Sequence, residues 1–357
     1  MKRRLLLAAV GAACAAAAIV GAPARADDDG RSVLFRLTDQ RITESSGLAV
    51  SLRHRNVVFT HNDSGHPPQV FAVDTRTGNT TATLTLAGAP ARDWESMTEC
   101  GGPDGPAVWV GDIGDNLAAW KTYRLLSFRE PANLTTGDVP YTSYDIKYAD
   151  GRARNAETLL CRPSDNRLFV VSKQDVGEAG VWEAPAQLRS DRVNVLTRVG
   201  SAPPIVTDGT FLPGSKHVIL RGYAEAWVVD PPTGRTVATV PPPIQIQGES
   251  VTATLDRSAL LFGSEGLNSA VWRVPLPADP VKLAGTGGPS PGDGEPTETP
   301  SATPHPSTHA SPRPIHEVSA KPVGDSHGLP GINGRWVALL SALGLGALVL
   351  TLATRRD

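Results

Sequence analysis

The chain lacks the residues and motifs that mark several large function classes. Only 3 of its 357 residues are cysteine, 2 are methionine and 5% are aromatic. It has no P-loop, no nucleophile elbow and no HExxH motif, so those signatures of nucleotide-binding, serine-hydrolase and metalloprotease sites are absent. Its formal net charge is −2 with no basic stripe, which argues against nucleic acid as a partner.

Long uncharged apolar runs occur only near the two ends. Residues 1–26 combine Lys2, Arg3 and Arg4 with an Ala-rich apolar run and an Ala-Arg-Ala cleavage site, which predicts a signal peptide for either Sec or twin-arginine export. Residues 336–354 carry no charge and are long enough to cross a bilayer as a helix. Arg355 and Arg356 follow, so residues 355–357 are predicted to be a cytoplasmic tail.

Residues 284–335 are dominated by Pro, Ser, Thr, Gly and His, a composition that cannot bury enough apolar surface to fold. We expect an extracellular stalk, partly polyproline II. The "LPGING" sequence before the apolar run lacks the threonine of an LPxTG motif, so anchoring by the helix is preferred to covalent wall attachment. The prediction is a single-pass protein of the cell membrane, whose partner is a cell-surface or cell-wall ligand or protein.

The remaining part, residues 27–283, contains an internal repeat. An acidic residue, one or two small residues and an apolar strand recur as "ESSGLAV", "DWESMTE", "NAETLL", "VTDGTFL" and "QGESVTA". The repeated acids are 51, 62, 51 and 41 residues apart and comprise Glu44, Glu95, Glu157, Asp208 and Glu249. Each repeat continues with a second and a third strand, and some show a fourth.

Four antiparallel strands that recur every 40 to 60 residues are typical of a β-propeller blade. The sequence predicts an all-β fold with five blades; six are the alternative, because one repeat is long. A β-sandwich or a parallel β-helix fits the repeated acid and its spacing less well. The N-terminal strand "SVLFRLTD" has no blade of its own, and we expect it to pair with the last repeat and close the ring.

In a propeller the first strand of each blade lines the central channel, so the repeated acids should encircle one mouth. The loops between second and third strands should converge there too. The candidate ligand- or cation-binding residues are Glu44, Asn62, Asp63, Asp93, Glu95, Asp112, Asp115, Asn116, Glu157, Asp208, Arg221, Glu249 and Glu265. Any single Asp or Asn among them has the alternative role of capping a turn.

Like charges at one mouth repel unless a cation or a basic group lies among them. Oxygen-only ligands suit Ca²⁺ or Mg²⁺, and the first candidates for metal ligands are Glu95, Asp112 and Glu157. Lys173 and Arg221 offer an internal counter-charge, so a metal-free mouth held by salt bridges is the alternative.

After removal of the signal peptide two cysteines remain, Cys100 and Cys161. Each follows its repeat acid by four or five residues, near the end of a first strand. In an exported chain this predicts a disulfide between adjacent blades, at the end of the channel away from the acidic mouth.

The order "ESSGLA", "VVFTHNDSG", "VFAVDTRTG", "DWESMT" resembles bacterial extracytoplasmic propellers of the phytase-like and SdiA-regulated kind, and "GDIGDN" resembles secreted propellers described as WD40-like. The resemblance covers residues 44 to 116; the WD dipeptide is absent. It implies Ca²⁺ binding and hydrolysis of phosphoesters or esters. Two hypotheses follow: a ligand- or partner-binding module at the acidic mouth, and a Ca²⁺-dependent phosphoesterase or esterase there.

Overall fold

Every regular element in the described part of the chain is a β-strand. The structure, a computed structural model, describes residues 30–101, 105–174, 177, 179–212, 215–231 and 233–276, all within one unit spanning Met1–Leu283. In these residues there is no helix with the length and apolarity needed to cross a membrane. The predicted signal peptide, stalk and transmembrane helix lie outside them.

Twenty of the 21 strands in the described residues form five antiparallel units of four strands each. The first unit consists of β2 (Ser45–Val50), β3 (Val57–Asn62), β4 (Gln69–Asp74) and β5 (Thr80–Thr85). The second consists of β6 (Trp94–Cys100), β7 (Ala107–Asp112), β8 (Tyr123–Arg129) and β10 (Tyr141–Tyr148). The third consists of β11 (Ala156–Arg162), β12 (Arg167–Ser172), β13 (Ala179–Glu183) and β14 (Asn194–Ala202).

The fourth unit consists of β15 (Asp208–Phe211), β16 (Val218–Arg221), β17 (Ala226–Asp230) and β18 (Arg235–Val240). The last consists of β19 (Gly248–Ala253), β20 (Ala259–Ser264), β21 (Ala270–Pro275) and, as its outer strand, β1 (Ser32–Arg36). Strand β1 pairs antiparallel with β21, with Arg36 opposite Ala270. This confirms the predicted closure by the N-terminal strand, which leaves β21 without an open edge.

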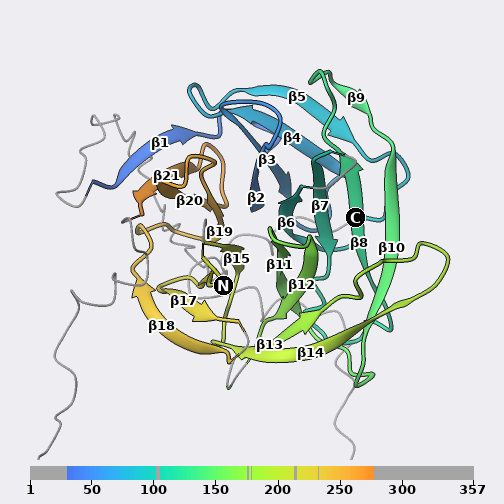
Figure 1. Cartoon of the computed structure of the whole chain (residues 1–357). Coiled ribbons are helices and arrows are strands. Elements are labelled where there is room, and N and C mark those ends of the chain that lie inside the picture. The colour runs from blue at the N-terminus through green and yellow to red at the C-terminus, as the bar shows by residue number, and fades with distance from the viewer. Residues whose placement is uncertain are drawn as a thin grey trace, which may run out of the picture. The chain divides into compact units, whose positions relative to one another are not determined.

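The five inner strands surround a common centre. β2 contacts β6, β6 contacts β11, β11 contacts β15, β15 contacts β19, and β19 contacts β2 again. Figure 1 shows the units arranged around this centre like the blades of a fan, with the outer strands β5, β10, β14, β18 and β1 at the rim. The fold is therefore all-β and propeller-like, as the repeat predicts.

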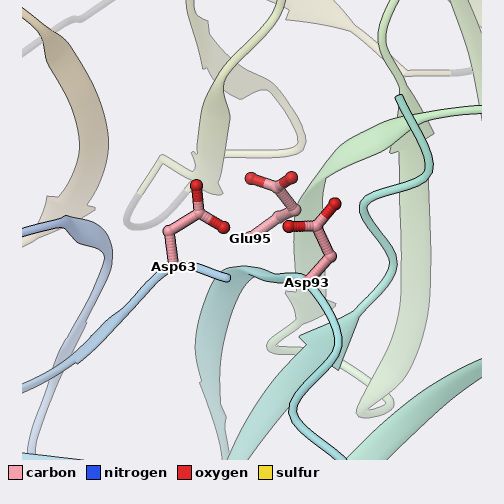
Figure 2. Close-up of side chains that lie close together, drawn as sticks. All are labelled: Asp63, Asp93 and Glu95. Carbon is pink, nitrogen blue, oxygen red and sulfur yellow. The ribbon is translucent and has the colours of Figure 1, made fainter. Parts of the chain in front are cut away.

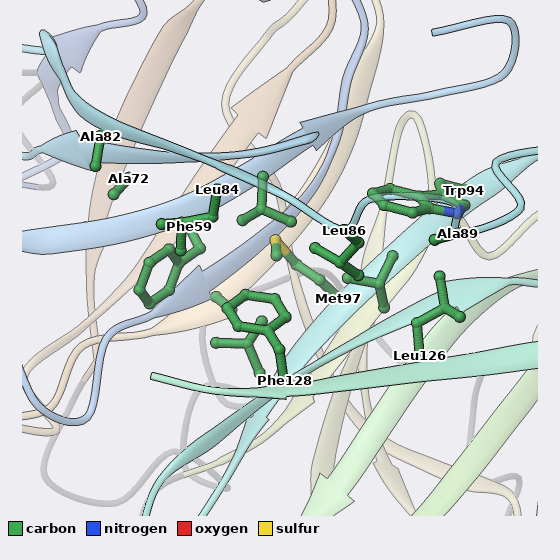
Figure 3. Packing of buried hydrophobic residues seen from close by; sticks show 14 of the residues in the cluster. Phe59, Ala72, Ala82, Leu84, Leu86, Ala89, Trp94, Met97, Leu126 and Phe128 are labelled. Carbon is green, nitrogen blue, oxygen red and sulfur yellow. The ribbon is translucent and has the colours of Figure 1, made fainter. Parts of the chain in front are cut away.

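The core lies between successive units, because each sheet buries both of its faces. One apolar cluster separates each neighbouring pair of units, and five clusters complete the circuit. Figure 3 shows the cluster between the first and second units, where Phe59 and Leu84 meet Met97 and Phe128. Phe59 and Phe128 meet edge to face with ring centroids 6.4 Å apart. Fully burying one such side chain contributes about 1.5–3 kcal/mol.

The second repeat is long because the chain between β8 and β10 leaves the sheet of the second unit. Between β8 and β10 the chain adds a two-residue strand, β9 (Gly137–Asp138), in parallel to β5 of the first unit. Strand β10 then pairs in parallel with β14, which joins the second and third units into one eight-stranded sheet. The repeat pattern predicted neither parallel pairing, since neither follows from hydrophobic alternation.

Cys100 and Cys161 form a disulfide between the innermost strands of the second and third units, with Cα atoms 5.8 Å apart. Both cysteines lie toward the ends of their strands, whereas Glu95 and Glu157 lie at the beginnings. The predicted disulfide is confirmed, and it lies at the end of the ring away from these acids.

Candidate cation-binding site

Three of the five repeated acids share one structural position. Glu95, Glu157 and Glu249 each lie where the pairing of the inner strand with its neighbour shifts register, as in a β-bulge. In β2 the same position holds Ser46, and Glu44 precedes the strand. A bulge turns its extra residue out of the regular ladder. The shared bulge explains how a glutamate at the start of a buried strand directs its carboxylate to the mouth.

Asp63, Asp93 and Glu95 form the densest acidic group, which we term the triad. One carboxylate oxygen from each lies within 4.8 Å of the others. Figure 2 shows the three carboxylates facing one another, with Asp63 approaching from the first unit and the other two from the start of β6. The carboxyl groups of Asp63 and Asp93 are close enough to form a hydrogen bond, a contact that raises the pKa of Asp93 and lowers that of Asp63.

Two caps hold the triad in place. The Asn62 side-chain oxygen accepts the backbone N–H groups of Thr43 and Glu44, both at 3.0 Å. One Asp112 oxygen accepts those of Arg92 and Asp93 at 3.0 and 2.9 Å in the next unit. Asn62 and Asp112, at the ends of β3 and β7, thus hold the loops that lead into the inner strands β2 and β6.

A glycine gives the triad room. A Cβ added at Gly114 would lie 2.2 Å from a Glu95 oxygen and 2.5 Å from an Asp93 oxygen. Any larger residue there would displace both carboxylates. The "GDIGDN" loop therefore contributes through its second glycine as well as through its acids.

Glu95 is a buried carboxylate without a donor. It is 5% exposed, and among the described residues none donates a hydrogen bond to its carboxylate or forms a salt bridge with it. Burial, followed by the charges of Glu157 and Asp63, raises the pKa of Glu95 well above its usual range. An ionised group in this setting needs a bound cation, and otherwise it holds a proton.

The neighbouring acids respond in the same way. Burial and the charge of Asp63 raise the pKa of Asp93 to about 8. The same two causes raise the pKa of Glu265 to about 8. Burial also raises the pKa of Asp63 and, together with the charge of Glu157, that of Glu249. These groups therefore share one electrostatic environment, as expected for acids gathered at one mouth.

Glu157 has an internal counter-charge. Lys173 donates to both Glu157 oxygens at 2.7 Å and to the Tyr223 hydroxyl at 3.1 Å. Burial is the largest single effect on Lys173 and opposes its charge, but Glu157, Tyr223 and Glu249 together outweigh it and raise the pKa of the lysine. Salt bridging, the alternative to a metal, thus describes the Glu157 side of the mouth, whereas no described lysine or arginine forms a salt bridge with the triad.

The carboxylates of Asp112 and Asp115 accept hydrogen bonds from neighbouring loop residues. Besides its capping oxygen, Asp112 offers its second oxygen to Arg92 Nε at 2.9 Å. The Asp115 carboxylate accepts the N–H groups of Ala119 and Trp120 and the Tyr123 hydroxyl. Of the metal ligands predicted from the sequence, Asp112 and Glu157 thus have internal partners, whereas Glu95 lies with Asp63 and Asp93.

Four further candidates lie beside or beneath the mouth. Asn116 accepts from the Asn155 side chain, and Glu44 contacts His66 at 3.2 Å. Asp208 is fully buried and lies opposite Arg221 in the backbone pairing of β15 with β16. Its carboxylate accepts a hydrogen bond from the Ser96 hydroxyl at 2.8 Å. Arg221, also fully buried, donates to the carbonyls of Ser250 and Gly263. Asp208 and Arg221 thus tie inner strands together.

Comparisons with known proteins give fold-level likeness only. No family model and no curated protein matches the sequence. A gluconolactonase of Xanthomonas campestris is 16% identical with a TM-score of 0.41, covering 71% of this chain and 91% of that one. The Myxococcus xanthus glutaminyl cyclase is 10% identical with a TM-score of 0.41, covering 69% and 97%. The Malassezia sympodialis allergen Mala s 1 is 8% identical with a TM-score of 0.45, covering 68% and 95%. At these values the likenesses carry no argument about function.

Proposed function

We propose that the chain is a five-bladed β-propeller that binds Ca²⁺ at Asp63, Asp93 and Glu95 and, through the ion, an oxygen-rich ligand at the channel mouth. The observation that carries the proposal is the Glu95 carboxylate, which is buried, has no donor among the described residues and faces two further carboxylates. Five four-stranded units around one centre support the blade count.

The donor set suits calcium. Calcium takes six to eight oxygen ligands at about 2.3–2.6 Å, so two oxygens on one ion lie at most about 5.2 Å apart. The 4.8 Å span of the triad falls inside this limit. The site has no sulfur or clustered imidazole, which zinc or copper would favour.

The number of oxygen ligands that calcium takes leaves room for a bound ligand molecule. Three carboxylates supply at most six oxygens, and Asp63 is only half-buried, so the site opens to solvent on that side. Oxygens of a ligand, such as a carboxylate, phosphate or hydroxyl, would complete the ligand shell of the ion. Lys173 and Tyr223 line the same mouth and add a positive charge and a hydroxyl group. The ligand is therefore expected to be anionic or rich in hydroxyl groups.

Calcium titration of the whole exported chain tests the proposal. Glu95→Gln should weaken calcium binding by about 100-fold or more, because it removes a ligand that no other group can replace. Glu99→Gln is the matched control: it lies on the same strand, burial also raises its pKa to about 8, and it is not part of the triad. Isothermal titration calorimetry measures both. Equal affinities for Glu95→Gln and the unaltered protein would refute the site.

We propose further that the chain is anchored at the cell surface by residues 336–354, as their uncharged apolar run predicts. The full chain should sediment with membranes, and a chain ending at residue 335 should be released into the medium. Immunoblots of membrane and medium fractions measure the partition. Retention of the truncated chain on the membrane would contradict anchoring by this segment.

A further inference from the structure

A groove of about 890 Å³ lies at the end of the sheets away from the triad. It is lined by the first residues of β7 and β10, the last residues of β8 and the connection between β8 and β10. That connection leaves the second unit and places β9 beside β5 of the first unit. It therefore does not cover the end of its own sheet that lies away from the triad. The groove is therefore a consequence of the long second repeat, and its volume is in the range of ligand sites.

Two aromatic rings stack on each other in this groove. Trp109 and Tyr144 are stacked with centroids 5.4 Å apart and an angle of 27° between their planes. Trp109 pairs with Ser127, which pairs in turn with Thr142, two residues before Tyr144. These side chains therefore share one face of the sheet, and the small Ser127 and Thr142 leave open space beside the rings.

Polar side chains line the same groove without partners among the described residues. The side chains of Asn133, Asp138 and Thr142 line the groove, and among the described residues none of them is engaged in a hydrogen bond or salt bridge. They offer an amide, a carboxylate and a hydroxyl at the border of an aromatic surface. A ligand that satisfies both features needs apolar faces and many hydroxyl groups at its edge.

We infer that this groove binds an oligosaccharide, with sugar rings stacked on Trp109 and Tyr144 and their hydroxyl groups hydrogen-bonded by Asn133, Asp138 and Thr142. A sugar ring presents C–H groups on its face and hydroxyl groups at its edge, which matches this distribution. The inference does not depend on the calcium site, which lies at the other end of the strands.

A glycan array probed with the whole exported chain, followed by calorimetry with the best-bound oligosaccharide, tests the inference. Trp109→Ala should weaken binding by about tenfold or more through loss of stacking. Tyr144→Phe keeps the ring and should change affinity less than Tyr144→Ala. Ser127→Phe should block the groove, because Ser127 lies on β8 between the strands that carry the two rings. Trp227→Ala is the matched control, a half-buried tryptophan on another unit, and should bind as the unaltered protein does.

Thermal melting of each variant separates loss of the site from loss of the fold. Variants that melt as the unaltered protein does and yet lose binding support the inference. Absence of binding to every glycan would overturn it, as would equal binding by the unaltered protein and Ser127→Phe. A proline-rich peptide is the competing occupant of an aromatic groove, and stronger binding of decaproline than of any glycan would also overturn it.

Discussion

In the presence of a chelator, the melting temperature is expected to fall by roughly 10 °C between about pH 5 and about pH 8.5. The cause is the set of acids at the mouth whose pKa values burial raises. Asp93, with a pKa raised from 3.8 to about 8, holds its proton in the folded protein across most of this range. In the unfolded chain it loses that proton near its ordinary pKa.

The sign follows from proton counting. Between about pH 4 and pH 8 the folded state binds more protons at this group than the unfolded state, so the free energy of unfolding decreases as pH rises. One unit of pKa corresponds to about 1.4 kcal/mol, and Asp93 alone therefore contributes several kcal/mol. For a domain of this size each kcal/mol changes the melting temperature by about 2–4 °C.

Saturating calcium should remove most of this loss at the alkaline end and have little effect near pH 5. The ion binds the ionised carboxylates, so it competes with protons and replaces them as pH rises. Differential scanning calorimetry with calcium or chelator across the pH range measures the effect. A melting temperature that stays constant, or that rises with pH in chelator, would contradict the raised pKa values. A calcium effect equal at both pH values would contradict binding to the triad.

Arg221→Leu is expected to lower the free energy of unfolding by about 3–5 kcal/mol. The guanidinium group is fully buried and donates to Ser250 and Gly263 carbonyls at 2.6 and 2.7 Å and to the Gln245 side chain at 2.7 Å. Leucine would leave these acceptors without a donor in a space closed to water. Burial lowers the pKa of Arg221 to about 10, while the nearby Glu249 and Asp208 act in the opposite direction, so the arginine remains charged at neutral pH.

Urea unfolding, followed by circular dichroism, measures this change. Arg221→Lys keeps the charge with fewer donors and should lose less than the leucine variant. Arg235→Leu, at an exposed arginine of β18 in the same unit, should change stability by no more than about 0.5 kcal/mol. A loss below about 1 kcal/mol in Arg221→Leu would show that Ser250 and Gly263 find other donors, and the arginine would then be free for a role at the mouth.

The repeat predicted the architecture because each unit carries its own local evidence. Alternating apolar residues, Gly and Asn turns and an acid at or just before the start of each inner strand recur five times, and a single propeller-like ring satisfies all of them. The disulfide was predictable for a similar reason, since Cys100 and Cys161 occupy related positions in adjacent repeats.

The candidate site was predictable only as a region. Asp63, Asp93 and Glu95 were all among the residues selected, but their association was not. The sequence favoured Asp112 and Glu157, with Glu95, as metal ligands over Asp63 and Asp93. In the fold, Asp112 is hydrogen-bonded to Arg92 and Glu157 to Lys173. Which acids keep free oxygens depends on partners from other strands and loops. No local pattern encodes these partners.

Composition and periodicity were enough to establish an all-β ring with acids toward one mouth and a disulfide toward the other, because these features repeat within short segments. The tertiary structure decided which three carboxylates meet, why Asp208 and Arg221 lie beneath the mouth, and where the long second repeat leaves a groove. These outcomes depend on distances between side chains far apart in the chain, which are set only when the units pack against one another.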